Sequence, residues 1–144
     1  MLIWGMENPL NLSLSIVIES VATFHNAFGI RNAPAPEAAP SPETIALRHR
    51  LMAEENEEYL EAAQAGDLVE VADALGDMLY ILCGTILQHG MQDVIEEVFT
   101  EIQRSNMSKL GADGRPIHRE DGKVMKGPNY KRPDLSFVLD RVEA

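Results

Sequence analysis

The chain has 144 residues, of which 45% are apolar and 6% aromatic, so it is long enough for one domain with a core of its own. Its net charge of −11 argues against a nucleic-acid duplex as partner, because phosphates would be repelled, and its single cysteine excludes an internal disulfide. The longest uncharged run, residues 78–92, is shorter than the roughly 20 apolar residues of a membrane span, and the N-terminus lacks the pattern of a secretory signal, so we expect a cytoplasmic protein with no membrane role.

The N-terminal extension, residues 1–12, carries no pattern that predicts packing, and we expect it to be disordered. Apolar residues then recur with a helical period at Val17, Val21 and Phe24, which predicts a helix over residues 13–28. The segment that follows, residues 32–42, is rich in proline and alanine. We expect it to be a linker that does not pack.

Capping signals predict the next two helices. Ser41 is a candidate N-cap and Pro42 suits the first helical position, so a second helix begins there. Gly66 breaks this helix, Asp67 caps a third helix, and Gly90 closes the third one.

A fourth helix is expected from about Asp93 to Leu110, with apolar residues on one side. Two Asp-Gly pairs follow, at residues 113–114 and 121–122, and they predict a short hairpin or an ordered loop. The expected fold class is therefore all-α, an up-and-down helical bundle with a basic C-terminal hairpin or loop arm. We expect one domain over residues 13–135 and a C-terminal tail over residues 136–144.

Carboxylates lie on the inward faces of the second and third helices. At about 100° per residue, Glu55 and Glu58 project from the middle of the apolar face of the second helix. That face consists of Leu47, Leu51, Met52, Tyr59 and Ala62. On the third helix, Glu70, Asp73 and Asp77 form one stripe.

These carboxylates have two interpretations. Runs of acidic residues on a helix are most simply a solvated face. Buried carboxylates, however, must be protonated, paired with a cation or bound to a metal, and the sequence has no Lys or Arg between Arg50 and Arg104. Two antiparallel helices carrying E-x-x-E and E-x-x-D make a site with oxygen ligands only, which Mg²⁺ or Mn²⁺ prefers, so Glu55, Glu58, Glu70 and Asp73 are candidate metal ligands.

Basic residues follow in the last third of the chain. The inward side of the fourth helix continues in phase to Asn106 and Lys109, and Lys123 and Lys126 lie on the expected hairpin, with Tyr130 beyond. Each lysine alone is more simply a surface charge. Together they supply positive charge for phosphate oxygens that metal ions leave uncovered.

The stretches "EENEE" (54–58), "EVADALGD" (70–77), "SNMSK" (105–109) and "DGKVMKGPNY" (121–130) together resemble the all-α nucleoside triphosphate pyrophosphatase superfamily, of the MazG and dimeric dUTPase kind. The resemblance covers residues 21–135. It implies Mg²⁺-dependent hydrolysis of a (d)NTP to the monophosphate and diphosphate, with Mn²⁺ as a substitute and dUTP or non-canonical nucleotides as substrates.

The resemblance also implies roles for single residues. Glu55, Glu58, Glu70 and Asp73 would bind the metal, and Glu54 would activate the attacking water. Asp77 would bind the sugar hydroxyl or a water next to the metal. The expected contacts with the nucleotide are Asn106, Lys109, Lys123, Lys126 and Tyr130.

Two other functions stay open at the level of the sequence. A phosphoribosyl-ATP pyrophosphohydrolase would share the metal motif, and an acidic helical interaction module would need no metal at all. The third helix is apolar on two sides, which a small bundle cannot cover, so we expect a homodimer.

Overall fold

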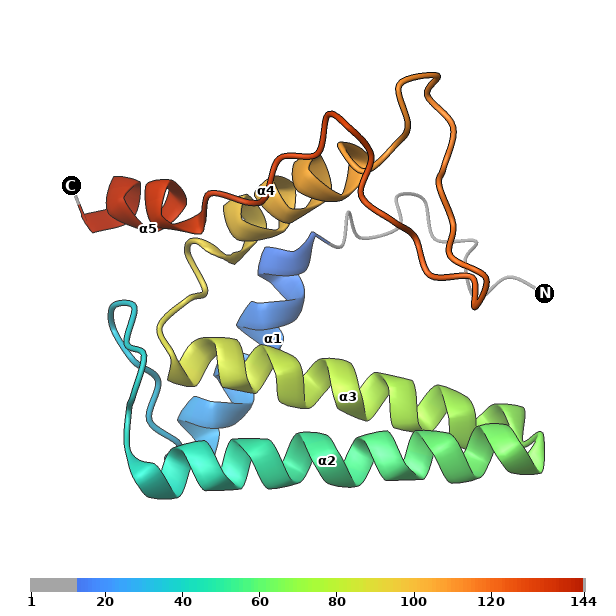
Figure 1. The fold of residues 1–144 in the computed structure, drawn as a ribbon. Helices are drawn as coiled ribbons and strands as arrows, with labels where there is room; N and C mark the ends of the chain where they lie inside the picture. Colours follow the sequence, from blue (N-terminus) through green and yellow to red (C-terminus); the bar gives the residue numbers. More distant parts are fainter. Residues whose placement is uncertain (1–12, 144) are drawn as a thin grey trace, which may run out of the picture. The chain divides into compact units, whose positions relative to one another are not determined.

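The computed structural model describes residues 13–143, and the extension over residues 1–12, for which we expected disorder, lies outside the described residues together with residue 144. Residues 13–143 form α-helices and no strand, which confirms the predicted all-α class (Figure 1). The helices are α1 (Leu14–Ala27), α2 (Pro42–Ala65), α3 (Leu68–Gln88), α4 (Ile95–Met107) and α5 (Leu135–Glu143). No helix within the described residues is long and apolar enough to cross a membrane. The chain forms two compact units, one that ends at Gln92 and one that begins at Asp93.

The predicted caps of α2 and α3 are confirmed. The hydroxyl of Ser41 accepts a hydrogen bond from the backbone N–H of Thr44 at 3.1 Å, which satisfies one free donor at the start of α2. Gly66 ends α2 with a φ of 67°, in the left-handed region that glycine adopts without strain. The Asp67 carboxylate then accepts from the N–H of Glu70 at 3.1 Å.

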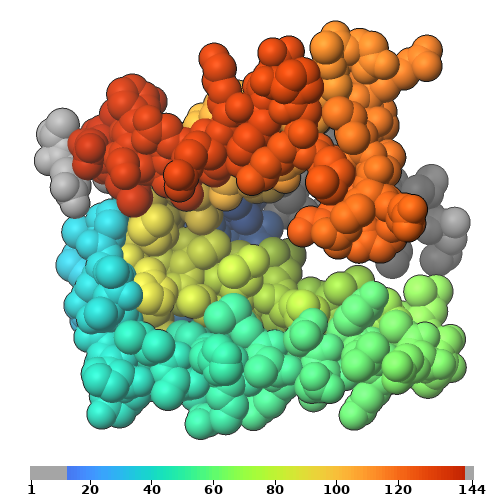
Figure 2. Space-filling view, viewed as in Figure 1, coloured from blue at the N-terminus to red at the C-terminus, as the bar shows by residue number. Residues whose placement is uncertain are grey.

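In the first unit, α2 and α3 lie side by side as an antiparallel pair, and α1 packs on α3 (Figure 1). The α1 side of this unit buries Ile18 and Val21, and α3 buries Ala74, Cys83 and Leu87. Helix α2 is different, because most of its side chains are exposed along its length (Figure 2). Of the expected apolar face of α2, Ala62 is buried, whereas Leu47 and Tyr59 are exposed.

The segment over residues 32–42 packs against the C-terminal end of α3, so the expectation of an unpacked linker is wrong. The N–H of Ala33 donates to the carbonyl of Leu87 at 3.0 Å, and that of Glu37 donates to the carbonyl of His89 at 2.8 Å. A Cβ at Gly90 would lie 2.0 Å from the carbonyl oxygen of Ala35. The last carbonyls of a helix lack partners within it, and this segment supplies two of the missing donors.

In the second unit, α4 begins and ends within the predicted range of residues 93–110. Its partner α5 occupies most of the region expected to be a tail. The Asp134 carboxylate accepts from the N–H of Phe137 at 3.0 Å at the start of α5. The side chain of Val138 on α5 is buried, so α5 has an apolar contact that the sequence pattern was too short to reveal.

Residues 117–125 form a short hairpin between α4 and α5. One antiparallel bridge joins His118 and Val124, and the N–H of Met125 donates to the carbonyl of Ile117 at 2.7 Å. The turn contains Gly122, whose φ is 86°. A role for this hairpin as a basic arm stays a prediction.

Candidate metal and nucleotide site

Glu55 is the centre of the carboxylate group between α2 and α3. It is half-buried, and its Oε2 atom is buried without a hydrogen-bond partner among the described residues. Desolvation raises the pKa of the Glu55 carboxyl, and the negative charges of Glu58, Asp77 and Asp73 raise it further. The structure therefore brings these four carboxylates together from two helices.

Glu70 joins the group through Glu58. Both side chains line a hollow of about 460 Å³ near the turn at Gly66 that joins α2 and α3. The other lining residues are Glu61, Ala62, Ala65 and Asp67. Glu58 is thus common to the group around Glu55, which includes Asp73, and to the hollow that Glu70 lines.

The residues fit a hard divalent cation by their chemistry. All the donors are carboxylate oxygens, and Glu55 holds a buried oxygen that lacks a partner. In the described part of the chain, however, no three His, Cys, Asp or Glu side chains are already arranged around a common point that could hold an ion. Glu58, Asp73 and Asp77 are exposed, so packing does not fix the rotamers of these three side chains.

Asp77 lies closer to the centre of this group than the sequence predicted. Its charge acts on Glu55 more strongly than that of Asp73. The signal was present in the sequence, because Asp77 is one helical turn after Asp73 on the same stripe. A role for Asp77 next to a metal or at the sugar hydroxyl stays a prediction.

Glu54 lies apart from the carboxylate group. Its side chain is exposed, and its Oε1 atom is 3.8 Å from Nε of Arg50, one turn earlier on α2. None of the charges that raise the pKa of Glu55 comes from Glu54. Its role in activating a water stays a prediction.

In the second unit, four of the five predicted nucleotide contacts lie near the end of α4. Nζ of Lys109 donates to Oδ1 of Asn106 at 2.8 Å, and Nζ of Lys126 lies 4.8 Å from the centre of the Tyr130 ring. The N–H of Gly127 donates to the carbonyl of Lys109 at 2.9 Å and so joins the two pairs.

Gly127 is required at this junction, because a Cβ would lie 2.2 Å from the carbonyl oxygen of Leu110. The fifth predicted contact, Lys123, belongs instead to the hairpin turn, where its N–H donates to Oδ1 of Asp121 at 3.1 Å.

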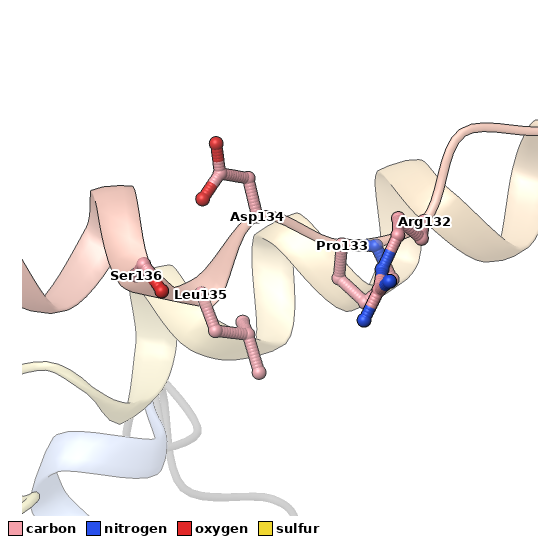
Figure 3. A pocket seen from close by; sticks show the side chains of 5 residues that line it. All are labelled: Arg132, Pro133, Asp134, Leu135 and Ser136. Carbon is pink, nitrogen blue, oxygen red and sulfur yellow. The ribbon is translucent and has the colours of Figure 1, made fainter.

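A second hollow, of about 590 Å³, lies along the segment that enters α5 (Figure 3). It is lined by the consecutive residues Arg132, Pro133, Asp134, Leu135 and Ser136, of which Asp134 and Leu135 point to opposite sides of the chain. None of the predicted site residues lines it. This hollow contains none of the carboxylates of α2 and α3, and neither Lys109 nor Lys126.

A family model described as phosphoribosyl-ATP pyrophosphohydrolase matches residues 21–106, which is more than half of the chain. The matched range contains all the predicted metal ligands and ends at Asn106. A comparison with curated proteins finds no match. The chain belongs to the phosphoribosyl-ATP pyrophosphohydrolase family, and with it to the all-α MazG-like superfamily of pyrophosphohydrolases that act on nucleotides.

Proposed function

We propose that the protein is a Mg²⁺-dependent pyrophosphohydrolase that cleaves a nucleotide between its α and β phosphorus atoms and releases diphosphate. The observation that carries this proposal is Glu55, a carboxylate with a raised pKa and an unpartnered buried oxygen among three further carboxylates. Unpaired carboxylates in such a position cost folding free energy unless they bind a cation. The family supports a pyrophosphohydrolase, and the metal and the bond cleaved are our proposal.

Two substrate classes have separate support. Phosphoribosyl-ATP is the first candidate, since the matching family model carries that activity in its description. A (d)NTP such as dUTP is the second candidate. It is supported by the resemblance of residues 105–109 and 121–130 to the MazG and dimeric dUTPase kind, stretches that contain the pairs Lys109–Asn106 and Lys126–Tyr130.

The chain's own residues have distinct tasks in this proposal. Glu55, Glu58, Glu70 and Asp73 would hold the Mg²⁺, with Asp77 within reach, and the bound ion would neutralise the phosphates and lower the pKa of a water. Glu54 would accept the proton of that water. Lys109, Lys123 and Lys126 would offset the charge of the phosphate oxygens, with Asn106 and Tyr130 next to them.

We also propose that the protein is a homodimer. Leu75, Leu79 and Leu82 lie along one side of α3 and are 50%, 46% and 47% exposed, which is unusual for a row of leucines on a monomer. Size-exclusion chromatography with light scattering tests this proposal. A wild-type mass near that of one chain would contradict it, and Leu79→Lys should convert a dimer to the monomer.

The decisive experiment offers the purified protein a panel of substrates with Mg²⁺ and separates the products. Phosphoribosyl-ATP, dUTP, the canonical dNTPs and ATP form the panel, and Glu55→Gln is the inactive control. Release of diphosphate supports the proposal and the fastest substrate decides between the two classes. Release of single phosphate, or no turnover of any substrate, would contradict it.

A further inference from the structure

Helix α2 packs along α3, and two of its side chains are buried against the rest of the first unit. Of the residues of α2, all of which the structure describes, only Arg48 and Ala62 are buried. Glu55 and Glu58 lie between these two buried residues. From Arg48 to Glu55 the distance along the helix is about 10 Å, at 1.5 Å per residue.

The two buried side chains differ in kind. Ala62 is next to the tight turn at Gly66, which already holds α2 and α3 together at that end. At the other end, the contact is made by the guanidinium group of Arg48. Its Nε donates to Oγ1 of Thr85 at 3.2 Å, and its Nη2 donates to the carbonyl of Ile81 at 3.3 Å.

The surface of α3 is shaped to receive this guanidinium group. A Cβ at Gly84 would lie 2.8 Å from Nη2 of Arg48 and 3.0 Å from Nε2 of His25. His25 comes from α1 and is buried, and its Nδ1 is 2.6 Å from Oδ1 of Asn32. Side chains from α1 and α2 therefore meet over one glycine of α3.

Arg48 has no ion-pair partner among residues 13–143. Burial of a cation without a carboxylate is costly, and an apolar residue of similar size would serve packing better. Unlike an apolar side chain, the guanidinium group makes directional hydrogen bonds. These bonds fix both the distance and the angle between the two helices. Packing alone therefore does not explain why an arginine is buried at this position.

We infer that Arg48, seated over Gly84, is a positioning residue that sets the separation of α2 and α3 at the carboxylate group. The inference rests on the proposed function, since it concerns the metal that these carboxylates would bind. Without Arg48, the N-terminal half of α2 loses the side-chain hydrogen bonds that join it to α3. Glu55 then moves away from Asp73 and Asp77, and an ion can no longer be held by both helices at once.

Two variants disturb the same contact from opposite sides. Arg48→Met removes the guanidinium group and keeps an apolar side chain of similar length. Gly84→Ala adds a Cβ whose nearest neighbours are the ends of two side chains, so it displaces them without a clash against the backbone. Arg31→Met is the matched control, because it removes an exposed arginine of the same unit whose partner is Glu37.

The readout is the affinity of the folded protein for Mn²⁺ alone, measured by electron paramagnetic resonance, together with the melting temperature in EDTA. Each of the two variants should bind Mn²⁺ about tenfold more weakly, the loss expected when charge-assisted hydrogen bonds no longer hold the ligands. The double variant should lose less than the product of the two factors, because both changes act through one contact. The control should bind like the wild type.

The outcomes separate the two proposals. If Arg48 only stabilises the fold, the melting temperature falls while the Mn²⁺ affinity of the folded variants equals that of the wild type, and the inference is overturned. Should Arg48→Met fail to fold, Gly84→Ala alone decides in the same way. If the wild type itself binds no Mn²⁺, the proposed metal site and this inference fall together.

Discussion

One carboxylate in each unit, Glu55 in the first and Glu101 in the second, has its pKa shifted in the opposite direction. In the first unit, Glu55 faces further carboxylates without a cation, and its pKa is raised. In the second unit, Glu101 accepts from Nη2 of Arg104 at 2.7 Å and from the N–H of Asp134 at 2.8 Å. The Arg104 guanidinium and this N–H lower the pKa of Glu101 to about 2.

This difference separates structural acids from acids that are available to a ligand. Glu101 joins the middle of α4 to Asp134 at the start of α5, and Asp121 joins the two sides of a hairpin turn through Arg119. Both gain stability as charged groups. The carboxylates of α2 and α3 oppose one another, so a bound cation is what would make their charge favourable.

The largest effect should come from the carboxylates that lack a cation. Glu55→Gln and Asp73→Asn should each reduce turnover by more than about 100-fold, because even groups behind the metal ligands typically contribute 10-fold to 100-fold. Glu57→Gln, on an exposed position of α2, is the control. Circular dichroism should show unchanged helix content, and full activity in either variant would refute the metal site.

Metal should stabilise the first unit by relieving repulsion. At 100 times its Kd, Mn²⁺ should raise the free energy of unfolding by about 2.7 kcal/mol, provided that the unfolded chain does not bind it. The double variant Glu55→Gln, Glu58→Gln should be at least as stable as the wild type in EDTA and nearly insensitive to Mn²⁺. Melting curves at matched ionic strength check this, and an equal shift with NaCl would mean that the carboxylates are a solvated face.

The lysines near the end of α4 should affect substrate binding more than catalysis. Lys109→Ala and Lys126→Ala should each cost about 1.5 to 3 kcal/mol of binding, the range for hydrogen bonds to charged groups, and this loss should appear mainly as a higher KM. Lys131→Ala is the control, because Lys131 contacts Ser108 through its backbone, which alanine keeps. Unchanged kinetics in both variants would show that these lysines are surface charges only.

The two kinds of acid should also give opposite dependences on pH. Since the pKa of Glu101 is lowered in the folded state, its contribution to stability is present above the unfolded pKa of about 4.5 and is lost as the pH falls toward 2. The pKa of Glu55 is raised in the folded state, so its contribution to stability has the opposite dependence on pH. Metal-free protein should lose stability as the pH rises through the raised pKa of Glu55.

Urea unfolding of metal-free protein across the acid range measures both slopes. Glu101→Gln should remove part of the loss at low pH. Glu55→Gln should remove part of the loss at higher pH, and identical profiles for the two variants would show that the acids do not differ in this way.

Local signals were sufficient to predict most helix boundaries and the clustering of carboxylates from α2 and α3. Ser41, Gly66 and Asp67 act within one helical turn, so their effect depends on neighbours in sequence alone. The facing of Glu55 and Asp73 follows from helical period once a tight turn at Gly66 makes the two helices antiparallel.

Contacts between distant residues could not be predicted in this way. No local pattern marks Arg48, which is buried because Gly84 and Thr85 on another helix receive it. Helix α5 was missed for a similar reason. It is short, and the burial of Val138, which depends on contacts with α4, adds to the local contact between Asp134 and Phe137.

The segment over residues 32–42 should be slow in hydrogen exchange, despite a composition that is typical of mobile chains. The amides of Ala33 and Glu37 are hydrogen-bonded to the carbonyls of Leu87 and His89, so they exchange only when the segment and the end of α3 separate. Their protection factors therefore report on how firmly the segment is held against α3. Proteases that favour exposed Pro/Ala chains should be excluded from it for the same reason.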